Sequence, residues 1–527
     1  MKLRGKTVDT RNFNFENGIL AAIREMYGVA ADADSYKLSH YCQYLPGATR
    51  MMSYIESRGG KFDVVVNFGA QLIIKEYLMG VMTHERVDNM KEFAEAHVGF
   101  FDEKAWRKIV DVYGGKLPIR IRNAQEGLAI PVKNVLLTIE TTVDDTDVFS
   151  LVSYLETMLL RLWHSMTVAT LSWHIWEVIM ENLSETSDFA EDEIPHKMID
   201  FGSRGGAGFQ GGAAFGGSGH LVNFQGSDTM IAIITMNLAY HSDMSAFSIP
   251  ASEHSTTTVW GKDGETRFLG NMFECYAKKQ NAILASVADS YNVEHFIKQI
   301  IGVDHKQHII DTFNEYGTTY VVRPDSNDAV RMPIQCIKWL DEIFGHTVNG
   351  KGYKVLNYNV RVIQGDGIDI DDLREILAEL KRLGYSGTNI AFGMGGGLLQ
   401  KMDRDTCKFA MKCCAVKVDG VWHDVYKNPA KLEWLDGPDA EPTHITGETF
   451  KMSKRGRLTL ITDGTYYKTI RLNDDDTFEV PDESWYEALE DIYVDGDLVR
   501  DMDLDTVRLN ARKSHTRFPM PPVAMAA

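Results

Sequence analysis

Glycines, charged side chains and one histidine stand at the ends of six short apolar runs between residues 197 and 397. The runs span residues 197–201, 246–250, 283–288, 318–322, 360–364 and 389–392. Helical patterns follow several of them, most clearly over 370–383, so the runs are predicted to be parallel strands. The carboxyl ends of parallel strands meet at one edge of a sheet, where ligands bind. The sequence therefore predicts one crowded site.

Two of these loops suit phosphate and sugar. Residues 393–397 include Gly395 and Gly396, and without Cβ atoms successive N–H groups can point at a phosphate. Gly365 and Asp366 form a second loop, in which the carboxylate suits ribose hydroxyls. A plain tight turn is the alternative interpretation of the loop over 393–397.

Two further loops carry ionisable groups. The segment Arg323-Pro324-Asp325 places a cation two residues from a carboxylate. The cation suits a phosphate, and the carboxylate suits a ribose or the ligand shell of a magnesium ion. A local salt bridge between the two is the alternative interpretation. Glu253 and His254 offer a general base or a nucleophile, although a lone histidine is more often structural.

Residues 206–211 match G-x-G-x-x-G after a predicted strand, and Asp228 follows at a suitable distance for a dinucleotide fingerprint. The glycines continue through Gly219, however, which disfavours the regular helix that such a site needs. The dinucleotide interpretation is therefore the weaker one.

The composition limits the class of partner. The chain has 527 residues and a net charge of −19, which argues against nucleic acid and a membrane surface. A local group of cations later in the chain is the exception. It suits several phosphate oxygens, and a face exposed to solvent is the alternative interpretation. The N-terminus lacks the apolar segment of a signal peptide, and the six cysteines form no C-x-x-C pair. We expect a cytoplasmic protein.

Ordered motifs from residue 31 to 457 resemble the nicotinamide phosphoribosyltransferase family of the type II phosphoribosyltransferases. They are Asp34-Ser35-Tyr36-Lys37, Asp200-Phe201-Gly202-x-Arg204-Gly205, Glu253-His254-Ser255-Thr256, Trp260-Gly261-Lys262-Asp263, Arg323-Pro324-Asp325-Ser326, 361–367 and 392–401. The resemblance implies an irregular α/β barrel (residues 171–405) beside a second α/β domain (29–170 with 406–515), with an extension over 1–28 and a tail over 516–527. It also implies a homodimer with shared active sites.

The implied reaction joins nicotinamide to the phosphoribosyl group of phosphoribosyl pyrophosphate, with Mg²⁺ and with stimulation by ATP. By resemblance, Phe201 and the partner subunit's Tyr36 sandwich the pyridine ring, and Asp228 accepts from the carboxamide. Arg204 and Arg323 hold phosphate, Asp325 and Asp366 bind ribose, and His254 is phosphorylated by ATP. The implied ligands of pyrophosphate and ATP also include Arg58, Arg404, Lys412, Lys427 and Lys451, and the implied supporting carboxylates are Asp34, Glu253 and Asp289.

The sequence departs from the family at Ala285, where a serine is frequent, and Ser286 is predicted to point to the other side of its strand. Three alternatives stay open at this stage. They are a nicotinate-specific relative, against which the charge of Asp228 argues, an NAD-dependent oxidoreductase using residues 206–211, and a binding protein without activity.

Overall fold

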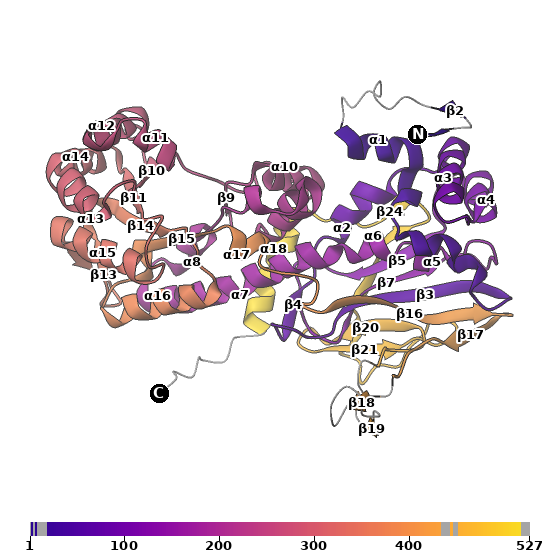
Figure 1. The fold of residues 1–527 in the computed structure, drawn as a ribbon. Coiled ribbons are helices and arrows are strands. Elements are labelled where there is room, and N and C mark those ends of the chain that lie inside the picture. The colour runs from indigo at the N-terminus through magenta and orange to yellow at the C-terminus, as the bar shows by residue number, and fades with distance from the viewer. Residues whose placement is uncertain are drawn as a thin grey trace. The chain divides into compact units, whose positions relative to one another are not determined.

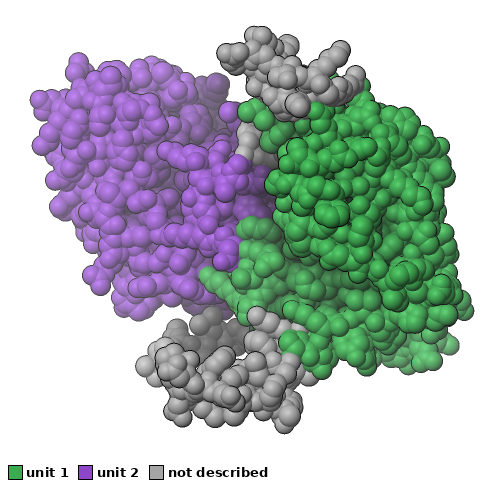
Figure 2. Space-filling model, turned by 45° about the vertical axis from the view of Figure 1, so that its right-hand side comes forward, with its two compact units in different colours: residues 1–163, 404–502 green, residues 164–403, 503–527 purple. Residues whose placement is uncertain are grey.

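The computed structural model describes residues 18–429 and 452–517, together with the backbone of strands β1 (Lys2–Leu3), β2 (Lys6–Thr7), β18 (Lys431–Glu433) and β19 (Thr443–Ile445). The side chains of residues 209, 210 and 517 lie outside this description. The chain divides into two compact units (Figures 1 and 2). Unit 1 comprises residues 1–163 and 404–502, and unit 2 comprises residues 164–403 and 503–527.

Unit 2 contains a six-stranded sheet in which every neighbouring pair is parallel. The order across the sheet is β10 (Ile283–Val287), β11 (Thr319–Arg323), β14 (Val360–Gln364), β15 (Ile390–Met394), β8 (Met198–Asp200) and β9 (Gly226–Ser227). Their Val- and Ile-rich runs are largely buried, as parallel strands covered by helices require. The predicted α/β architecture with a parallel sheet is confirmed.

The predicted run over 246–250 forms no regular strand, but this segment bridges the two edges of the sheet. Phe247 pairs with Gly226 of β9, and Ala251 pairs with Ala285 of β10. The Phe247 N–H donates to Gln225 O at 2.8 Å, and the Ala285 N–H donates to Pro250 O at 2.9 Å. The sheet therefore closes through single bridges, and its interior holds Ala285, Val321 and Ile363.

Helices connect the strands of unit 2. The longer ones are α7 (Leu162–Thr186), α10 (Met230–Ala239), α12 (Glu265–Tyr276), α14 (Lys306–Tyr316), α15 (Arg331–Phe344), α16 (Ile370–Arg382) and α18 (Leu504–Arg517). The shorter ones are α8 (Ala190–Glu193), α9 (Gly217–His220), α11 (His254–Thr258), α13 (Val293–His295) and α17 (Gly396–Leu399). Asp369 caps α16 by accepting from two backbone N–H groups, which explains where that helix begins.

The glycine-rich segment after β8 is helical, contrary to the sequence expectation. A 3₁₀ turn over Ser203–Gly205 precedes a π-helix over Gly208–Gly216, and α9 follows directly. A Cβ on Gly212 would lie 2.4 Å from the backbone nitrogen of Ala207, so the wide π-turns need glycine for close packing. The segment is no regular α-helix of a dinucleotide site.

Unit 1 is built on a seven-stranded antiparallel sheet. Its order is β17 (Val421–Asp424), β16 (Phe409–Val418), β3 (Ala48–Ser57), β7 (Val135–Thr141), β5 (Ile119–Ala124), β23 (Leu489–Val494) and β24 (Asp497–Leu498). Figure 1 shows the early strand β3 beside the late strand β16, and both chain segments are needed to complete the sheet. A hairpin of β20 (Leu458–Thr462) and β21 (Tyr467–Arg471) follows, with β22 (Tyr486–Glu487) beside β20.

The remaining elements of unit 1 are mostly helices. They are α1 (Gly18–Tyr27), α2 (Ala70–Ile73), α3 (His84–His97), α4 (Glu103–Tyr113), α5 (Leu151–Tyr154), α6 (Glu156–Leu160), the 3₁₀ helix η3 (Ser35–Cys42) and the strands β4 (Val64–Val66) and β6 (Ala129–Pro131).

Helix α18 belongs to unit 2, whereas the sequence-based boundaries placed residues up to 515 with unit 1. The reason is a set of long-range contacts. Arg508 donates to Leu221 O at 3.1 Å and to Ser245 O at 2.6 Å, and His515 stacks on Trp173 and Trp176 of α7.

Candidate active site

The ring of Phe201 packs closely against two glycines at the ends of the neighbouring strands β14 and β15. A Cβ on Gly393 would lie 2.0 Å from Cε2 of Phe201, and a Cβ on Gly365 would lie 2.8 Å from the same atom. The Phe201 N–H donates to Met394 O at 3.0 Å, which fixes the backbone beneath the ring. These glycines were expected to bind phosphate, and the structure shows that Gly365 and Gly393 also make room for an aromatic ring.

Asp228 follows β9, which pairs with β8, the strand that Phe201 follows. Its carboxylate accepts a short hydrogen bond from the Ser248 hydroxyl, and its N–H donates to Asp200 O at 2.9 Å. Asp200 is fully buried beneath the loop, and burial raises the pKa of its carboxyl group although the Gly202 N–H donates to it at 2.7 Å. The sequence did not indicate a role for Ser248, because the run over 246–250 was predicted only as a strand.

Phe201, Asp228, Ser248 and Arg323 line a cavity of about 610 Å³ that extends along the inside of the sheet of unit 2. Apolar side chains line its middle, among them Ala285, Val321 and Ile363. Ser286, the neighbour of Ala285, points away and shares a hydrogen bond of 2.6 Å with the Tyr320 hydroxyl. The expectation for these two side chains is met, and the cavity wall has no hydroxyl at residue 285.

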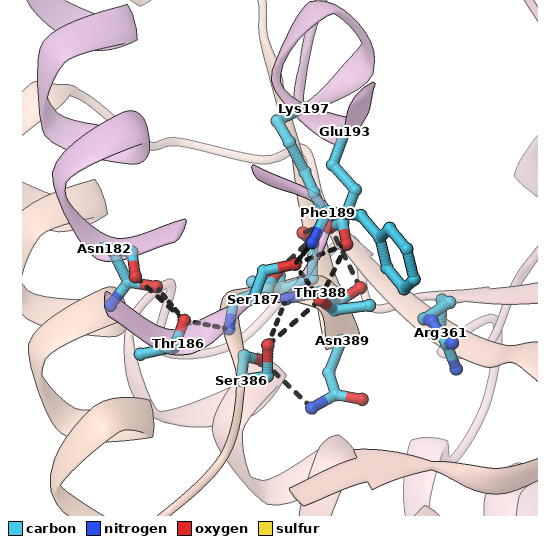
Figure 3. Close-up of polar contacts among 12 residues, drawn as sticks. Asn182, Thr186, Ser187, Phe189, Glu193, Lys197, Arg361, Ser386, Thr388 and Asn389 are labelled. Atoms are coloured by element: carbon cyan, nitrogen blue, oxygen red, sulfur yellow. Dashed lines mark hydrogen bonds and ion pairs between the residues drawn. The ribbon is translucent and has the colours of Figure 1, made fainter. Parts of the chain in front are cut away.

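The other end of the cavity reaches the amino ends of the strands, where a buried polar network lies (Figure 3). Lys197 donates to three backbone carbonyls at 3.1 Å and pairs with Glu193 at 3.0 Å, while Glu193 accepts from Ser187 and Thr388. Burial lowers the pKa of Lys197, and it lowers the pKa of Arg361 to about 10. No motif in the sequence indicated this network.

His254 begins α11 and lies among the carboxylates of two other strand ends. Its Nε2 is 3.2 Å from Asp289 Oδ1, and its Nδ1 is 3.7 Å from Asp325 Oδ2. Asp289 is 3% exposed at its side chain and also accepts from the Asp325 N–H at 2.9 Å. Arg323 Nε lies 3.5 Å from Asp325 Oδ1. The structure thus brings together four predicted site residues that are up to 71 positions apart, counting from 254 to 325.

Two of the carboxylates expected to support the site have local structural roles. Glu253 is the N-cap of α11 and forms a capping box with Thr256, so its side chain stabilises the helix start. Asp34 precedes η3 in unit 1 and accepts from the Thr157 hydroxyl at 2.8 Å.

The remaining predicted groups of unit 2 lie on loops at the carboxyl ends of the strands. Arg204 is exposed on the 3₁₀ turn after β8, and Gly395 and Gly396 begin α17 after β15. Asp366 and Pro324 follow β14 and β11. This edge therefore carries the phosphate and sugar candidates together with Phe201 and His254.

Unit 1 contains a group of cations. Burial lowers the pKa of Lys412, and the nearby charges of Arg58, Lys427 and Arg404 lower it further, while Glu156 acts in the opposite direction. Arg58 Nε is 3.3 Å from Glu56 Oε1, and among the described residues its buried Nη2 has no hydrogen-bond partner. An unsatisfied guanidinium nitrogen beside other cations is typical of an anion site.

Two further predictions concern unit 1. Tyr36 lies on η3 and is 57% exposed, so its ring is available for a contact outside its own unit. Lys451 lies outside the described residues, as does most of 432–448, which the resemblance implies is an insertion relative to the family.

Within 18–429 and 452–517, no three His, Cys, Asp or Glu side chains form a group that could hold a metal ion. No helix among these residues is both long enough and apolar enough to cross a bilayer.

Similar proteins bear on this site. Residues 196–433 match the nicotinate phosphoribosyltransferase family, and residues 28–121 match the N-terminal domain of nicotinamide phosphoribosyltransferase. A nicotinamide phosphoribosyltransferase of Xanthomonas campestris is 46% identical over 482 residues, which cover 91% of this chain and 97% of that protein. The protein of the same name from Mycoplasma pneumoniae is 29% identical over 440 residues, covering 75% and 91%.

Two solved structures share the fold at low sequence identity. Nicotinate-nucleotide pyrophosphorylase from Pyrococcus furiosus has a TM-score of 0.56 at 12% identity, covering 97% of this chain and 99% of that one. Human nicotinic acid phosphoribosyltransferase has a TM-score of 0.52 at 14% identity, covering 93% and 94%. The full-length similarity to the Xanthomonas enzyme decides the family, and this chain belongs to the nicotinamide phosphoribosyltransferases.

Proposed function

We propose that this protein transfers the phosphoribosyl group of phosphoribosyl pyrophosphate to nicotinamide, for the salvage of NAD. The bond between ribose C1 and the pyrophosphate oxygen breaks, and a bond from C1 to the pyridine nitrogen forms. The products are nicotinamide mononucleotide and pyrophosphate. The observation that carries this proposal is the placement of Phe201, Asp228 and Arg323 around one end of the same cavity.

The pyridine site consists of Phe201 and Asp228. A ring held flat against Phe201 has its nitrogen directed along the ring plane, which fixes the approach to ribose C1. The Ser248 hydroxyl occupies one oxygen of Asp228 and leaves the other for the carboxamide NH₂. A nicotinate carboxylate would instead face the charge of Asp228, so we expect selectivity for the amide.

The sugar and its phosphates would lie at the loops of the same edge. Arg204 and Arg323 offer cations, Asp325 and Asp366 offer carboxylates to ribose hydroxyls, and Gly395 and Gly396 offer backbone N–H groups. When C1 loses pyrophosphate it becomes electron-poor, and nearby carboxylates stabilise that charge.

Mg²⁺ is proposed to arrive with the pyrophosphate. The donor set fits this mode, because Mg²⁺ bound to substrate phosphates needs only one or two protein carboxylates. Asp325, which is 30% exposed at its side chain, is the carboxylate placed to provide one. The ion would neutralise charge on the leaving group.

ATP is proposed to stimulate turnover by phosphorylating His254. The ring is 45% exposed and Asp289 orients it, as a nucleophilic histidine requires. His254→Ala is expected to lose the stimulation by ATP while keeping slow transfer, as measured by product formation with and without ATP. The control is His305→Gln, which replaces a histidine whose Nε2 contacts Thr266 O on α12. Equal stimulation of the His254 variant and the wild type would contradict this role.

A cytoplasmic homodimer completes the proposal. Met230, Ile234 and Leu238 form an exposed apolar stripe at every fourth residue of α10, with exposures of 75%, 52% and 76%. Such a stripe favours burial against a second copy of the chain. The partner would supply Tyr36, Arg404 and Lys412 to each site.

Product analysis tests the reaction itself. Purified protein is incubated with phosphoribosyl pyrophosphate, Mg²⁺ and either nicotinamide or nicotinate, with and without ATP. We expect the mononucleotide of nicotinamide and a much slower reaction of nicotinate. The nicotinate arm is included because residues 196–433 match the nicotinate family, and preference for nicotinate would overturn the assignment of Asp228.

A further inference from the structure

Two residues on either side of Tyr36 are tied to helix α6 of the same unit. On one side, the Asp34 N–H donates to the Thr157 hydroxyl at 3.2 Å, and that hydroxyl donates to Asp34 Oδ2 at 2.8 Å. On the other side, Lys37 Nζ donates to Glu156 Oε2 at 2.9 Å. Glu156 and Thr157 are the first two residues of α6. The start of η3 is therefore held on both sides of a tyrosine that is itself exposed.

Lys37 is buried although it carries a charge. Its side chain is 2% exposed, and its Nζ also donates to Ser153 O of α5 at 2.8 Å. The same Nζ lies 5.5 Å from the centroid of the Tyr36 ring, within the range of a cation–π contact. An ammonium group has three N–H donors, so one charge can bind a carbonyl, a carboxylate and a ring face together. Lys37 thus connects the helices that support η3 to the ring that η3 presents.

The orientation of the Tyr36 ring is restricted by a second neighbour on η3. The His40 ring lies nearly perpendicular to it, with centroids 4.7 Å apart and 79° between the planes. A side chain whose orientation is fixed before binding loses less conformational entropy in the complex. An exposed ring that is restricted in this way suits stacking on a planar ligand.

Stability alone does not account for a lysine at this position. The gain from a buried ion pair is offset by the cost of desolvation, and an apolar residue of similar size is often as stable. Methionine would fill the same space as Lys37 but would make none of the contacts of Nζ. Glu156 is 30% exposed at its side chain, so water solvates it once the lysine is replaced. What the charge contributes is a defined position for η3.

We propose that Lys37, together with Thr157, is a positioning residue for nicotinamide, because the two hold Tyr36 in the orientation that stacks on the pyridine ring in the partner subunit's site. This inference rests on the proposed function of Tyr36. In this arrangement neither positioning residue contacts a substrate, and both act through the tyrosine. The KM for nicotinamide should therefore depend on both residues, and the KM for the phosphoribosyl donor on neither.

The kinetic test uses Lys37→Met and Thr157→Val, which remove the two anchors with little change in volume. In each variant we expect the KM for nicotinamide to rise about fivefold, as for the loss of a hydrogen bond. The KM for phosphoribosyl pyrophosphate stays within about twofold. The matched control is Lys417→Met on β16, where the lysine pairs with Asp144 at 3.1 Å, and it should change neither value. Equal rises of both KM values would overturn the proposal.

A double-mutant cycle with Tyr36→Ala distinguishes positioning from a purely structural role. The readout is the Kd of nicotinamide mononucleotide measured by calorimetry, which needs no turnover. Lys37→Met should raise this Kd about fivefold when Tyr36 is present and less than about twofold when residue 36 is alanine. An equal loss of affinity in both backgrounds would contradict the proposal.

Glu156 stays unchanged in these variants for a reason of charge. Burial lowers the pKa of Lys412, and the charge of Glu156 opposes that shift. Replacing Glu156 would therefore alter the phosphate-binding candidates as well as the anchor of η3. Lys37→Met and Thr157→Val avoid this, because they leave the carboxylate in place.

Hydrogen exchange over 35–42 tests the anchors without substrate. The amides of η3 are expected to exchange faster in Lys37→Met and Thr157→Val than in the wild type and in Lys417→Met. If the wild type makes no mononucleotide but these amides still respond, the proposed function fails and the anchors stand. Exchange over η3 that is the same in all four proteins would show that neither residue holds the segment, and it would overturn the inference whatever the activity.

Discussion

At the scale of single residues, the position of the Phe201 ring depends on the absence of side chains on Gly393 and Gly365. Gly393→Ala would place a Cβ 2.0 Å from Cε2 of Phe201, so the ring must move from its position. We expect the KM for nicotinamide to rise about tenfold, equivalent to ~1.4 kcal/mol, with a smaller change in the KM for the phosphoribosyl donor. Steady-state kinetics with each substrate varied measure both values.

Gly211→Ala is the matched control for that variant, since a Cβ there would meet nothing within 4 Å. Its KM for nicotinamide should equal that of the wild type. An unchanged KM in Gly393→Ala would show that Phe201 does not hold the base.

Asp200 is a second residue whose environment has a measurable consequence. Burial raises its pKa in the folded protein, so the folded state binds its proton more tightly than the unfolded state does. The contribution of this group to stability is present at low pH and is lost as the pH rises through the raised pKa. Asp200→Asn is therefore expected to raise the melting temperature at pH 8 and to have little effect near pH 4.

The control for Asp200→Asn is the same change at the exposed residue Asp243, where no such gain is expected. Calorimetry at the two pH values distinguishes the cases. A gain from Asp200→Asn of the same size at both pH values would show that charge burial is not its cause.

At the scale of elements, Lys197 connects the start of β8 to the segment that leads into β15 (Figure 3). Lys197→Met would leave the partly buried Glu193 without its cation, and breaking a fully buried pair costs about 3–5 kcal/mol, which is the upper bound here. We expect a lower denaturation midpoint in urea. Lys197→Met combined with Glu193→Gln removes both charges and should recover part of the loss, and no recovery would argue against the ion pair.

The strands of unit 2 were predictable because apolar runs such as 360–364 are buried on both sides and end in distinctive loops. Closure of the sheet was not predictable from the sequence, because the segment from Phe247 to Ala251 makes only one bridge to each edge. The polar candidates Asp325 and His254 were found from their place after strands. Ser248 and Lys197 were missed, because only tertiary packing brings Ser248 to Asp228 and brings Lys197 to the carbonyls of residues 387, 388 and 390.

At the scale of the whole molecule, the proposed homodimer predicts that two inactive variants regain activity when their subunits are mixed. Tyr36→Ala and Phe201→Ala affect different units of the chain. If each site takes Tyr36 from the partner, mixing the two inactive variants regenerates one intact site in every mixed dimer. With random exchange of subunits we expect about a quarter of the wild-type activity.

Mixing is done after mild dissociation, and each variant treated alone is the control. Sedimentation confirms that dimers have re-formed. Activity that stays at the level of the separate variants would place Tyr36 and Phe201 of one site in the same subunit, or would place Tyr36 outside the site.

The path of the chain between the two units has a consequence for synthesis on the ribosome. All six strands of the unit 2 sheet lie within residues 198–394, whereas the unit 1 sheet needs strands from β3 at residue 48 to β24 at residue 498. Domains generally fold in the order of their synthesis, from the N-terminus. Here the unit begun first cannot complete its sheet until nearly the whole chain has emerged, so the parallel sheet made in the middle of translation is the first that can form.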